Sequence, residues 1–302
     1  MIPPSIPTDI QVFRARMAVP REELDDLLDA MAIMDEAPGS WENVDTGEAW
    51  IEAFGIDEDE LYQRAREMAD IAESVDGRVH VAQIEPLARE DWTESWKKFF
   101  HIIHVTDKIT IRPIWEEYDA AEGEIVVDIE PGMSFGTGIH PTTQSCLKLL
   151  EQLSANKAML DSKVIDMGCG SGILSIAANK LGYREVEGYD YDPAAVKVSK
   201  ENSEHNGLKD KIPFDVADVT APTPLPRGNV VVANILAVVL IDAAKAIAAS
   251  VDVSAECGHA LILSGILENQ YEEVKAAYQA EGFVEKQNIQ IGEWKSGLFV
   301  KA

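Results

Sequence analysis

Cysteine is scarce in this 302-residue sequence, which contains only Cys146, Cys169 and Cys257. Three widely separated thiols leave one unpaired in any disulfide scheme, and their spacing matches no zinc-binding pattern. Disulfide frameworks belong to oxidising compartments, so this cysteine usage favours a reducing one. We expect a cytoplasmic protein that holds no metal and whose thiols serve as small apolar side chains.

Long hydrophobic runs are also missing. The longest apolar stretch, 230–241, is interrupted by Asn234 and is shorter than the roughly 20 residues that cross a bilayer. Residues 1–16 lack a basic segment followed by an apolar one, so we expect no secretory signal. Neither a membrane-spanning helix nor export is indicated.

Positive charge is the third deficit. The chain has 26 lysine and arginine residues against 53 aspartate and glutamate residues, a formal net charge of -27. Such a surface repels the phosphates of a nucleic acid, so we expect no direct nucleic-acid substrate. It could attract a basic protein, or it could serve solubility in a salty cytoplasm, and the charge alone does not separate these explanations.

Residues 1–85 are expected to form a small α+β domain. Apolar residues recur here at the spacing of amphipathic helices and of half-buried strands. The order strand, helix, strand, strand, helix, strand is that of a ferredoxin-like domain. The expected elements are a strand at 10–17, a helix at 21–33, a hairpin at 40–54 that turns at 45–47, a helix at 57–74 and a strand at 78–84.

A second domain is expected at 105–302, after a connector at 86–104 that includes a short aromatic helix at 92–100. Strands alternate with helices in this part, which predicts an α/β fold with a doubly wound, Rossmann-like sheet. We expect a hairpin around 105–114, strands at 125–129, 163–167, 185–189, 230–233 and 260–263, helices at 172–181, 193–206, 236–249 and 269–281, and a closing antiparallel hairpin of 284–291 with 297–301.

A glycine-rich turn, DMGCGSG at 166–172, joins a β-branched strand to a helix. Glycines let a ligand approach the backbone closely. The dinucleotide fingerprint G-x-G-x-x-G is disfavoured because Ile173 stands where its third glycine is required. Asp166 would repel a pyrophosphate but suits an ammonium or sulfonium group. Asp166, Gly168 and Gly170 are therefore candidate ligand contacts, and a tight turn without a ligand is the alternative.

Asp190 ends the next strand, eighteen residues after Gly172. A carboxylate in this place can accept hydrogen bonds from both ribose hydroxyls of an adenosyl group. Asp192, directly before Pro193, is better placed to cap the following helix. The glycine turn upstream favours a cofactor-binding role for Asp190 over that of a simple loop aspartate.

A loop rich in glycine, proline and hydroxyl residues precedes a helix expected at 144–153. Phe135 could cover the adenosyl or methionyl part of a ligand, and Thr143 could offer its hydroxyl. Gly136 and Thr137 belong to the same candidate contact. The alternative is a helix-capping turn with a surface histidine at 140, which is the role that we favour for that histidine because no metal is expected.

Asn234 stands at the carboxyl end of an apolar strand, where doubly wound sheets bind their ligands. An amide in such surroundings is unfavourable unless it finds partners. Its carbonyl is placed to orient an amine, so Asn234 is the candidate catalytic residue and a further cofactor contact. The alternative is a cap for the helix that follows.

Together these motifs resemble the ribosomal protein L11 methyltransferase (PrmA) family of class I S-adenosylmethionine-dependent methyltransferases. The resemblance covers P-G-x-x-F-G-T-G-x-H-P-T-T at 131–143, G-C-G-S-G-I-L at 168–174, D-x-D-P at 190–193 and A-N-I-L-A at 233–237, with further motifs at 91–96, 112–115 and 263–270. The glycine turn is common to many methyltransferases, so the pairing of the 135–143 loop with 234–237 is the specific part. Residues 1–85 resemble the family in topology only.

The resemblance implies S-adenosylmethionine as cofactor, bound by residues matching Thr143, Gly168, Asp190 and Asn234. It also implies an N-terminal domain that grips the substrate protein and a flexible connector that brings several amines to one active site. The implied function is N-methylation of lysine side chains of ribosomal protein L11, a basic protein at the base of the large-subunit stalk, with its N-terminal amine as a further candidate. The sequence departs from the family pattern at Ile139, in a long 156–161 connection and in an extended 1–9 segment. These departures bear on the substrate rather than the cofactor.

The predicted reaction is in-line attack of a neutral amine on a sulfonium methyl group. With an ordinary lysine pKa of about 10.4, on the order of one amine in a thousand is neutral near pH 7, so the site must desolvate the amine or drain its proton. Leu236 and Ala237 replace the proline and tyrosine of base methyltransferases, which disfavours a flat base as acceptor. Two alternatives stay open: a protein-lysine methyltransferase with another target, and a non-catalytic, ribosome-associated module that binds S-adenosylmethionine.

Overall fold

The computed structural model describes residues 12–31, 38–42, 48–55, 57–76, 78, 80–87, 101–130, 140–254 and 256–302. Contacts along the chain divide it into two compact units, Met1–Phe99 and Phe100–Ala302. The connector expected at 86–104 spans this division. None of the described helices is long and apolar enough to cross a membrane.

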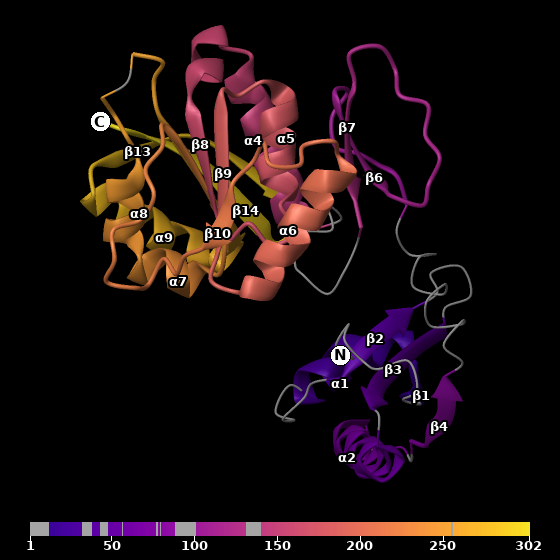
Figure 1. Cartoon of the computed structure of the whole chain (residues 1–302). Helices are drawn as coiled ribbons and strands as arrows, with labels where there is room; N and C mark the ends of the chain where they lie inside the picture. The colour runs from indigo at the N-terminus through magenta and orange to yellow at the C-terminus, as the bar shows by residue number, and fades with distance from the viewer. Residues whose placement is uncertain are drawn as a thin grey trace. The chain divides into compact units, whose positions relative to one another are not determined.

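The first unit is a four-stranded antiparallel sheet with two helices on one face (Figure 1). The strand order is β2-β3-β1-β4, and the connectivity is the ferredoxin-like one expected. Apolar side chains of β1, β3, α1 and α2 form its core. The elements are β1 (Val12–Pro20), the 3-10 helix η1 (Arg21–Glu23), α1 (Leu24–Met31), β2 (Gly39–Glu42), β3 (Glu48–Gly55), α2 (Glu58–Asp76) and β4 (Ala82–Leu87).

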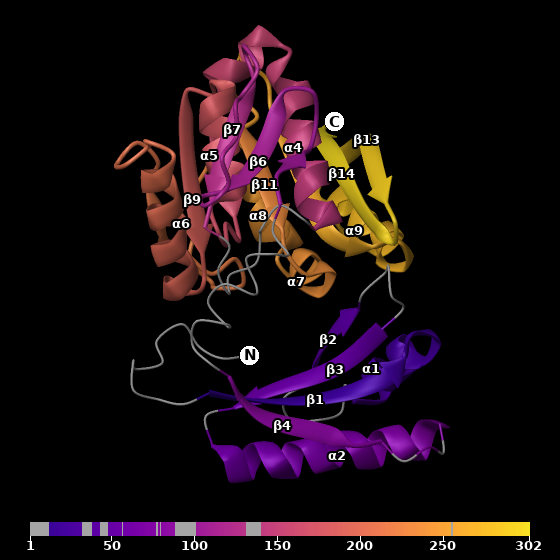
Figure 2. The ribbon, with the colours of Figure 1, turned by 90° about the vertical axis from the view of Figure 1, so that its right-hand side faces the viewer.

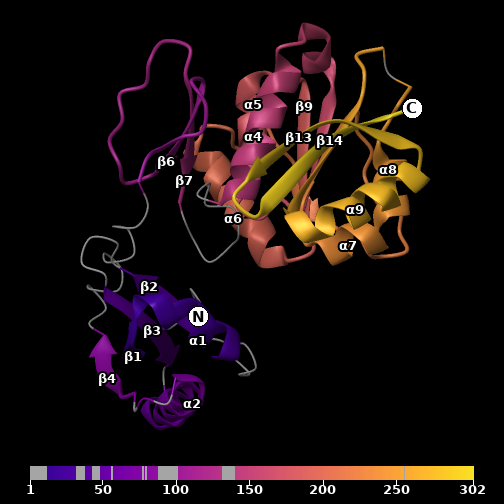
Figure 3. The same ribbon diagram turned by 180° about the vertical axis from the view of Figure 1, so that it is seen from behind.

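The second unit is built on a seven-stranded sheet with the order β10-β9-β8-β11-β12-β14-β13. Figure 3 shows its last two strands, β13 and β14. The strands from β10 to β12 run parallel, and β14 and β13 close the sheet as an antiparallel hairpin. The expected doubly wound sheet is confirmed. Its strands are β8 (Lys163–Met167), β9 (Glu185–Asp190), β10 (Phe214–Val216), β11 (Val230–Asn234), β12 (Ala260–Leu267), β13 (Phe283–Ile291) and β14 (Trp294–Lys301).

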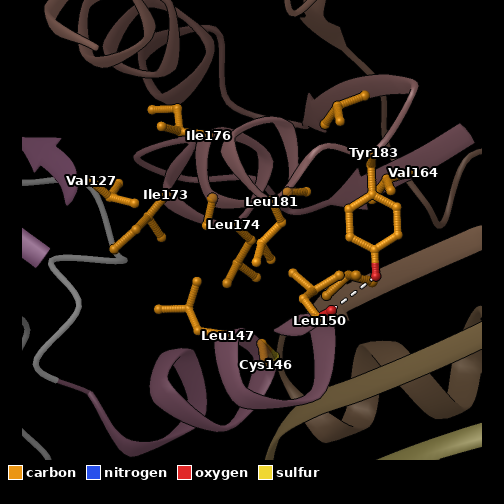
Figure 4. Close-up of a cluster of buried hydrophobic side chains, with 14 of the residues drawn as sticks. Val127, Cys146, Leu147, Leu150, Val164, Ile173, Leu174, Ile176, Leu181 and Tyr183 are labelled. Atoms are coloured by element: carbon orange, nitrogen blue, oxygen red, sulfur yellow. Dashed lines mark hydrogen bonds between the residues drawn. The ribbon is translucent and has the colours of Figure 1, made fainter. Parts of the chain in front are cut away.

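Helices cover both faces of this sheet (Figure 2), and the buried side chains of each face form a separate core. Successive residues of β8 point into opposite cores, Val164 into one and Ile165 into the other, which is why the central strands are apolar throughout. Figure 4 shows the core that contains Val164, where the Tyr183 hydroxyl donates to the carbonyl of Leu150 at 2.9 Å. The helices are α4 (Pro141–Ser154), α5 (Ile173–Leu181) and α6 (Pro193–His205) on this face, and α7 (Ala237–Asp242), α8 (Ala244–Ser250) and α9 (Glu268–Ala280) on the other.

A separate three-stranded sheet belongs to the same unit and consists of β5 (Ile103–His104), β6 (Ile109–Pro113) and β7 (Ile125–Ile129). β5 and β6 form the expected antiparallel hairpin, and β7 pairs with β6 in parallel. β7 ends directly before residues 130–139, the last nine of which lie outside the described residues. This small sheet therefore determines where the segment predicted to cover the ligand begins.

Several expected boundaries differ from the structure. The single helix expected at 236–249 is two helices that break at Ala243, and alanine, a strong helix former, carries no sequence signal for a break. Trp294 and Lys295, expected in the last turn, begin β14. β10 was missed because three residues are too few to show a period. The aromatic helix expected at 92–100 and the hairpin turn at 45–47 lie outside the described residues.

Candidate functional site

The carboxyl ends of β8 and β11 form the point where the winding of the sheet reverses. From β8 the chain proceeds outward to β9 and β10, then returns to β11 on the other side of β8. In open α/β sheets the crevice at such a reversal receives the ligand. The glycine turn follows β8, Asp190 ends β9 and Asn234 ends β11, so the topology brings these predicted residues to one edge.

Ile235 fills this reversal point between two glycines. Gly168 has a φ of +74°, and a Cβ on it would lie 2.3 Å from Cγ2 of Ile235. Gly265, at the irregularity in β12, has a φ of +81°, and a Cβ there would lie 2.3 Å from the carbonyl oxygen of Ile235. Left-handed backbone and lack of space both require glycine at these positions. Packing against Ile235 therefore constrains Gly168 independently of any ligand.

The carboxylate of Asp190 ties β9 to the glycine turn. Its Oδ2 accepts from the N–H of Gly170 at 2.9 Å, and its Oδ1 accepts from the N–H of Asp192 at 3.1 Å. Each carboxylate oxygen has two acceptor sites, so one on each oxygen is left for a ligand hydroxyl. Asp192 caps α6 by accepting from the N–H of Ala194 at 2.8 Å, which confirms its expected structural role.

Asp166 lies fully buried in β8. Its Oδ2 accepts from the backbone N–H of Ser175 at 3.1 Å and from the hydroxyl of Ser175 at 2.7 Å, so it holds the first turn of α5. Its Oδ1 is buried and has no hydrogen-bond partner among the described residues. Burial raises the pKa of this carboxyl to about 7, so its negative charge is incomplete at neutral pH.

Replacing Asp166 with asparagine is expected to change how stability depends on pH. The ordinary pKa of 3.8 rises to about 7 on folding, so the folded state binds the proton more tightly. Wild-type stability therefore falls as pH rises from about 4 to 7. In urea denaturation, the midpoint of Asp166→Asn should exceed that of wild type at pH 8, and the difference should narrow toward pH 4. If the urea midpoints of the two proteins changed with pH in parallel, the carboxyl of Asp166 would not be the source of the pH dependence.

Thr143, in the first turn of α4, is fully buried. Its Oγ1 has no partner among the described residues. The helix is tied to the sheet beside it, because Ser264 on β12 donates from Oγ to the carbonyl of Thr142 at 3.2 Å. Ser264 is also the register partner of Asn234. The start of α4 thus lies next to the end of β11, as a shared ligand site requires.

His140 is the N-cap of α4. Its Nδ1 accepts from the N–H of Thr142 at 3.4 Å, and its ring meets that of Trp294 edge-on with centroids 4.7 Å apart. Burial lowers the pKa of this histidine, which favours the neutral ring. The capping role that we favoured is confirmed, but the ring is partly buried against Trp294 rather than free at the surface.

Asn234 carries an unused carbonyl at the end of β11. The residue is 9% exposed, and its Oδ1 is buried without a partner among the described residues. Helix α7 begins at Ala237 with Leu236 as N-cap and no side-chain capping bond, so the alternative of a capping asparagine is not seen. Leaving such an acceptor unsatisfied costs about 1–3 kcal/mol, and exceptions of this kind call for an explanation such as a functional role.

Phe135, Gly136 and Thr137 lie outside the described residues, so their contacts stay predictions. A residue that the sequence reasoning missed does contact the glycine turn, since Ser199 on α6 donates to the carbonyl of Gly170 at 2.8 Å. The alternation of strands and helices that predicted a helix at 193–206 contains no signal for this polar contact. Only the fold reveals which face of the helix meets the turn.

Known proteins share both the sequence and the fold of this chain. The family model described as "Ribosomal protein L11 methyltransferase (PrmA)" matches residues 19–301. The ribosomal protein L11 methyltransferase of Citrifermentans bemidjiense is 42% identical over 238 residues, which covers 78% of this chain and 75% of the relative. That of Syntrophomonas wolfei is 36% identical over 251 residues, which covers 81% and 77%.

A solved structure agrees with these relatives. The crystal structure of the ribosomal protein L11 methylase from Lactobacillus delbrueckii subsp. bulgaricus matches with a TM-score of 0.58 and 29% identity, covering 67% of this chain and 99% of that one. The family model extends through both compact units. The chain therefore belongs to the ribosomal protein L11 methyltransferase (PrmA) family.

Proposed function

We propose that this enzyme uses S-adenosylmethionine to methylate lysine side chains of ribosomal protein L11, with the N-terminal amine of that protein as a further acceptor. One observation carries the proposal. Thr143 Oγ1, Asp166 Oδ1 and Asn234 Oδ1 are all buried without partners among the described residues. They belong to elements that meet where the sheet reverses its winding, and buried polar atoms of this kind gain stability when a ligand supplies partners.

The residues at this edge suit S-adenosylmethionine chemically. Asp190 keeps acceptor sites for ribose hydroxyls, and the buried hydroxyl oxygen of Thr143 suits the ammonium group of the methionyl part. A phosphate ligand would favour a lysine or arginine beside it. The turn at 166–172 contains neither residue. When bound, S-adenosylmethionine supplies a methyl group on positively charged sulfur that an amine can take directly.

Asn234 is the proposed catalytic residue. Its Oδ1 would accept one N–H of the incoming amine and so direct the nitrogen lone pair toward the methyl group. Desolvation at this buried edge lowers the pKa of a lysine and increases the neutral fraction. A strong base is not required, because orientation of the two reactants can itself supply much of the acceleration. The proton released on methylation passes to solvent.

Residues 1–85 are the proposed substrate-recognition domain, joined through the connector 86–104. The sheet face opposite its helices carries an arginine beside two tryptophans. The guanidinium of Arg16 lies 3.8 Å from the ring centroid of Trp50 and 5.3 Å from that of Trp41, and its Nε lies 2.9 Å from Oε1 of Glu52. Arginine and tryptophan are enriched in protein–protein contacts, which supports a protein substrate.

Transfer of tritium from labelled S-adenosylmethionine to purified large-subunit components tests this function. We expect label on ribosomal protein L11, release of S-adenosylhomocysteine and none on ribosomal RNA. Label on a different protein would favour the alternative of a protein-lysine methyltransferase that acts on that protein. Cofactor binding without transfer to any component would favour a non-catalytic module. Trp50→Ala should lower labelling of L11 while cofactor affinity is unchanged, which separates recognition from cofactor binding.

A further inference from the structure

Helix α6 carries a row of polar side chains on the face toward β7 and the glycine turn. Ser199 and Asn202 on the helix, and Asn206 as its C-cap residue, recur at helical spacing. Asn202 is only 1% exposed, although asparagine is a poor choice for a helix interior. A buried amide must satisfy both its oxygen and its nitrogen, so the partners of Asn202 reveal what it does.

The amide of Asn202 joins the glycine turn to the residue that follows β7. Its Oδ1 accepts from the backbone N–H of Glu130 at 2.9 Å, and Glu130 is the last described residue before 131–139. Its Nδ2 donates to the carbonyl of Ser171, inside the glycine turn, at 2.9 Å. One side chain therefore holds Ser171 of the glycine turn and Glu130 after β7 at a fixed separation.

Asn206, one helical turn later, makes a similar pair of bonds to β7, and its Nδ2 also donates to the carbonyl of Asn202 at 2.8 Å. Its Oδ1 accepts from the N–H of Asp128 at 2.9 Å, and its Nδ2 donates to the carbonyl of Asp128 at 2.6 Å. Residues one turn apart on a helix are separated by about 6 Å along the axis, and alternate residues of a strand by about 6.6 Å. The distance between the two asparagines thus matches the distance between alternate N–H groups, those of Asp128 and Glu130, along one strand edge.

We infer that Asn202 is a positioning residue for cofactor binding. It acts through Ser171 and Glu130 and holds the glycine turn at a fixed distance from the end of β7. The inference rests on the proposed function, because the glycine turn that Asn202 holds is the backbone predicted to contact S-adenosylmethionine. Asn206 holds the same strand without contact to the turn, and so provides a matched comparison.

The test compares Asn202→Asp with Asn206→Asp in the full-length protein. Each substitution keeps the size and the acceptor oxygen but replaces the NH₂ donor with an oxygen that repels the facing carbonyl. Titration calorimetry with S-adenosylmethionine should give a dissociation constant raised at least about tenfold for Asn202→Asp and changed by less than about threefold for Asn206→Asp. Both variants should be less stable in urea, so stability alone does not explain the difference.

Steady-state kinetics provide a second readout. Asn202→Asp should raise KM for the cofactor while kcat at saturation stays within about threefold, since no reacting group is lost. If Asn202→Asp does not fold, the neutral Asn202→Ser, which also removes the bridge, takes its place. An unchanged dissociation constant, or equal increases in both asparagine variants, would overturn the inference. Failure of the wild-type protein to bind S-adenosylmethionine would instead refute the proposed function.

Discussion

Asn234→Ala is expected to lower kcat by about a hundredfold or more, because removal of one preorganised polar group from an active site has effects of that size. The dissociation constant for S-adenosylmethionine should change far less, by under about threefold. The reason lies in the geometry of the amide. Its Oδ1 is buried and has no partner among the described residues, so the incoming amine is its proposed partner. Single-turnover kinetics and calorimetry separate the two effects.

Ser264→Ala is the control for this substitution. Ser264 is the register partner of Asn234 on the neighbouring strand, but its hydroxyl is engaged with the Thr142 carbonyl and with Ser296, at 3.2 Å and 2.7 Å. This control should lose stability with little loss of kcat. Asn234→Ala should show the opposite, since it breaks no described bond of Oδ1. A variant at 234 with normal kcat, or with kcat and affinity reduced equally, would rule out the proposed role.

Gly168→Ala is expected to weaken S-adenosylmethionine binding by about a hundredfold. A left-handed residue with a Cβ costs about 1–2 kcal/mol by itself. The new methyl group would also lie 2.3 Å from Cγ2 of Ile235, so either the turn or Ile235 must move. Movement of the turn displaces the backbone that is predicted to contact the cofactor. Calorimetric titration measures the loss directly.

Two further variants separate the clash from backbone strain. Gly182 also has a positive φ, +98°, but a Cβ there would meet nothing within 4 Å. Gly182→Ala should therefore reduce stability without altering cofactor affinity. Ile235→Ala removes the obstructing Cγ2, so combining it with Gly168→Ala should recover part of the affinity relative to Ile235→Ala alone. Equal loss of binding in Gly182→Ala would show that strain, not the clash, is responsible.

The parts of the site that could be predicted from sequence are those with local signals. The glycine turn, the strand before it and the helix after it are adjacent in the chain, and their order determines the geometry. Asp190 and Asn234 were assigned to the same edge because parallel strands place their carboxyl ends together. The N-capping role of Asp192 also followed from its neighbour Pro193. Each of these inferences needed only a short window of residues.

Contacts between distant segments could not be read in this way. Ile235 lies between Gly168 and Gly265, and nothing near position 235 in the sequence indicates either neighbour. Asn202 occupies a helix whose apolar spacing is compatible with many rotations, so its amide could equally have faced solvent. The position of the break at Ala243 also lacks a local signal, because Ala243 and Ala244 are strong helix formers.

The asparagine pair on α6 has a consequence for how the protein behaves at high concentration. β7 lies at the edge of its small sheet, and an unpaired strand edge is a template for association with strands of other molecules. Asn202 and Asn206 occupy the N–H groups of Glu130 and Asp128, and Lys180 donates to the carbonyl of Val126 at 2.5 Å. Helix side chains thus take the place of a fourth strand and protect this edge from aggregation.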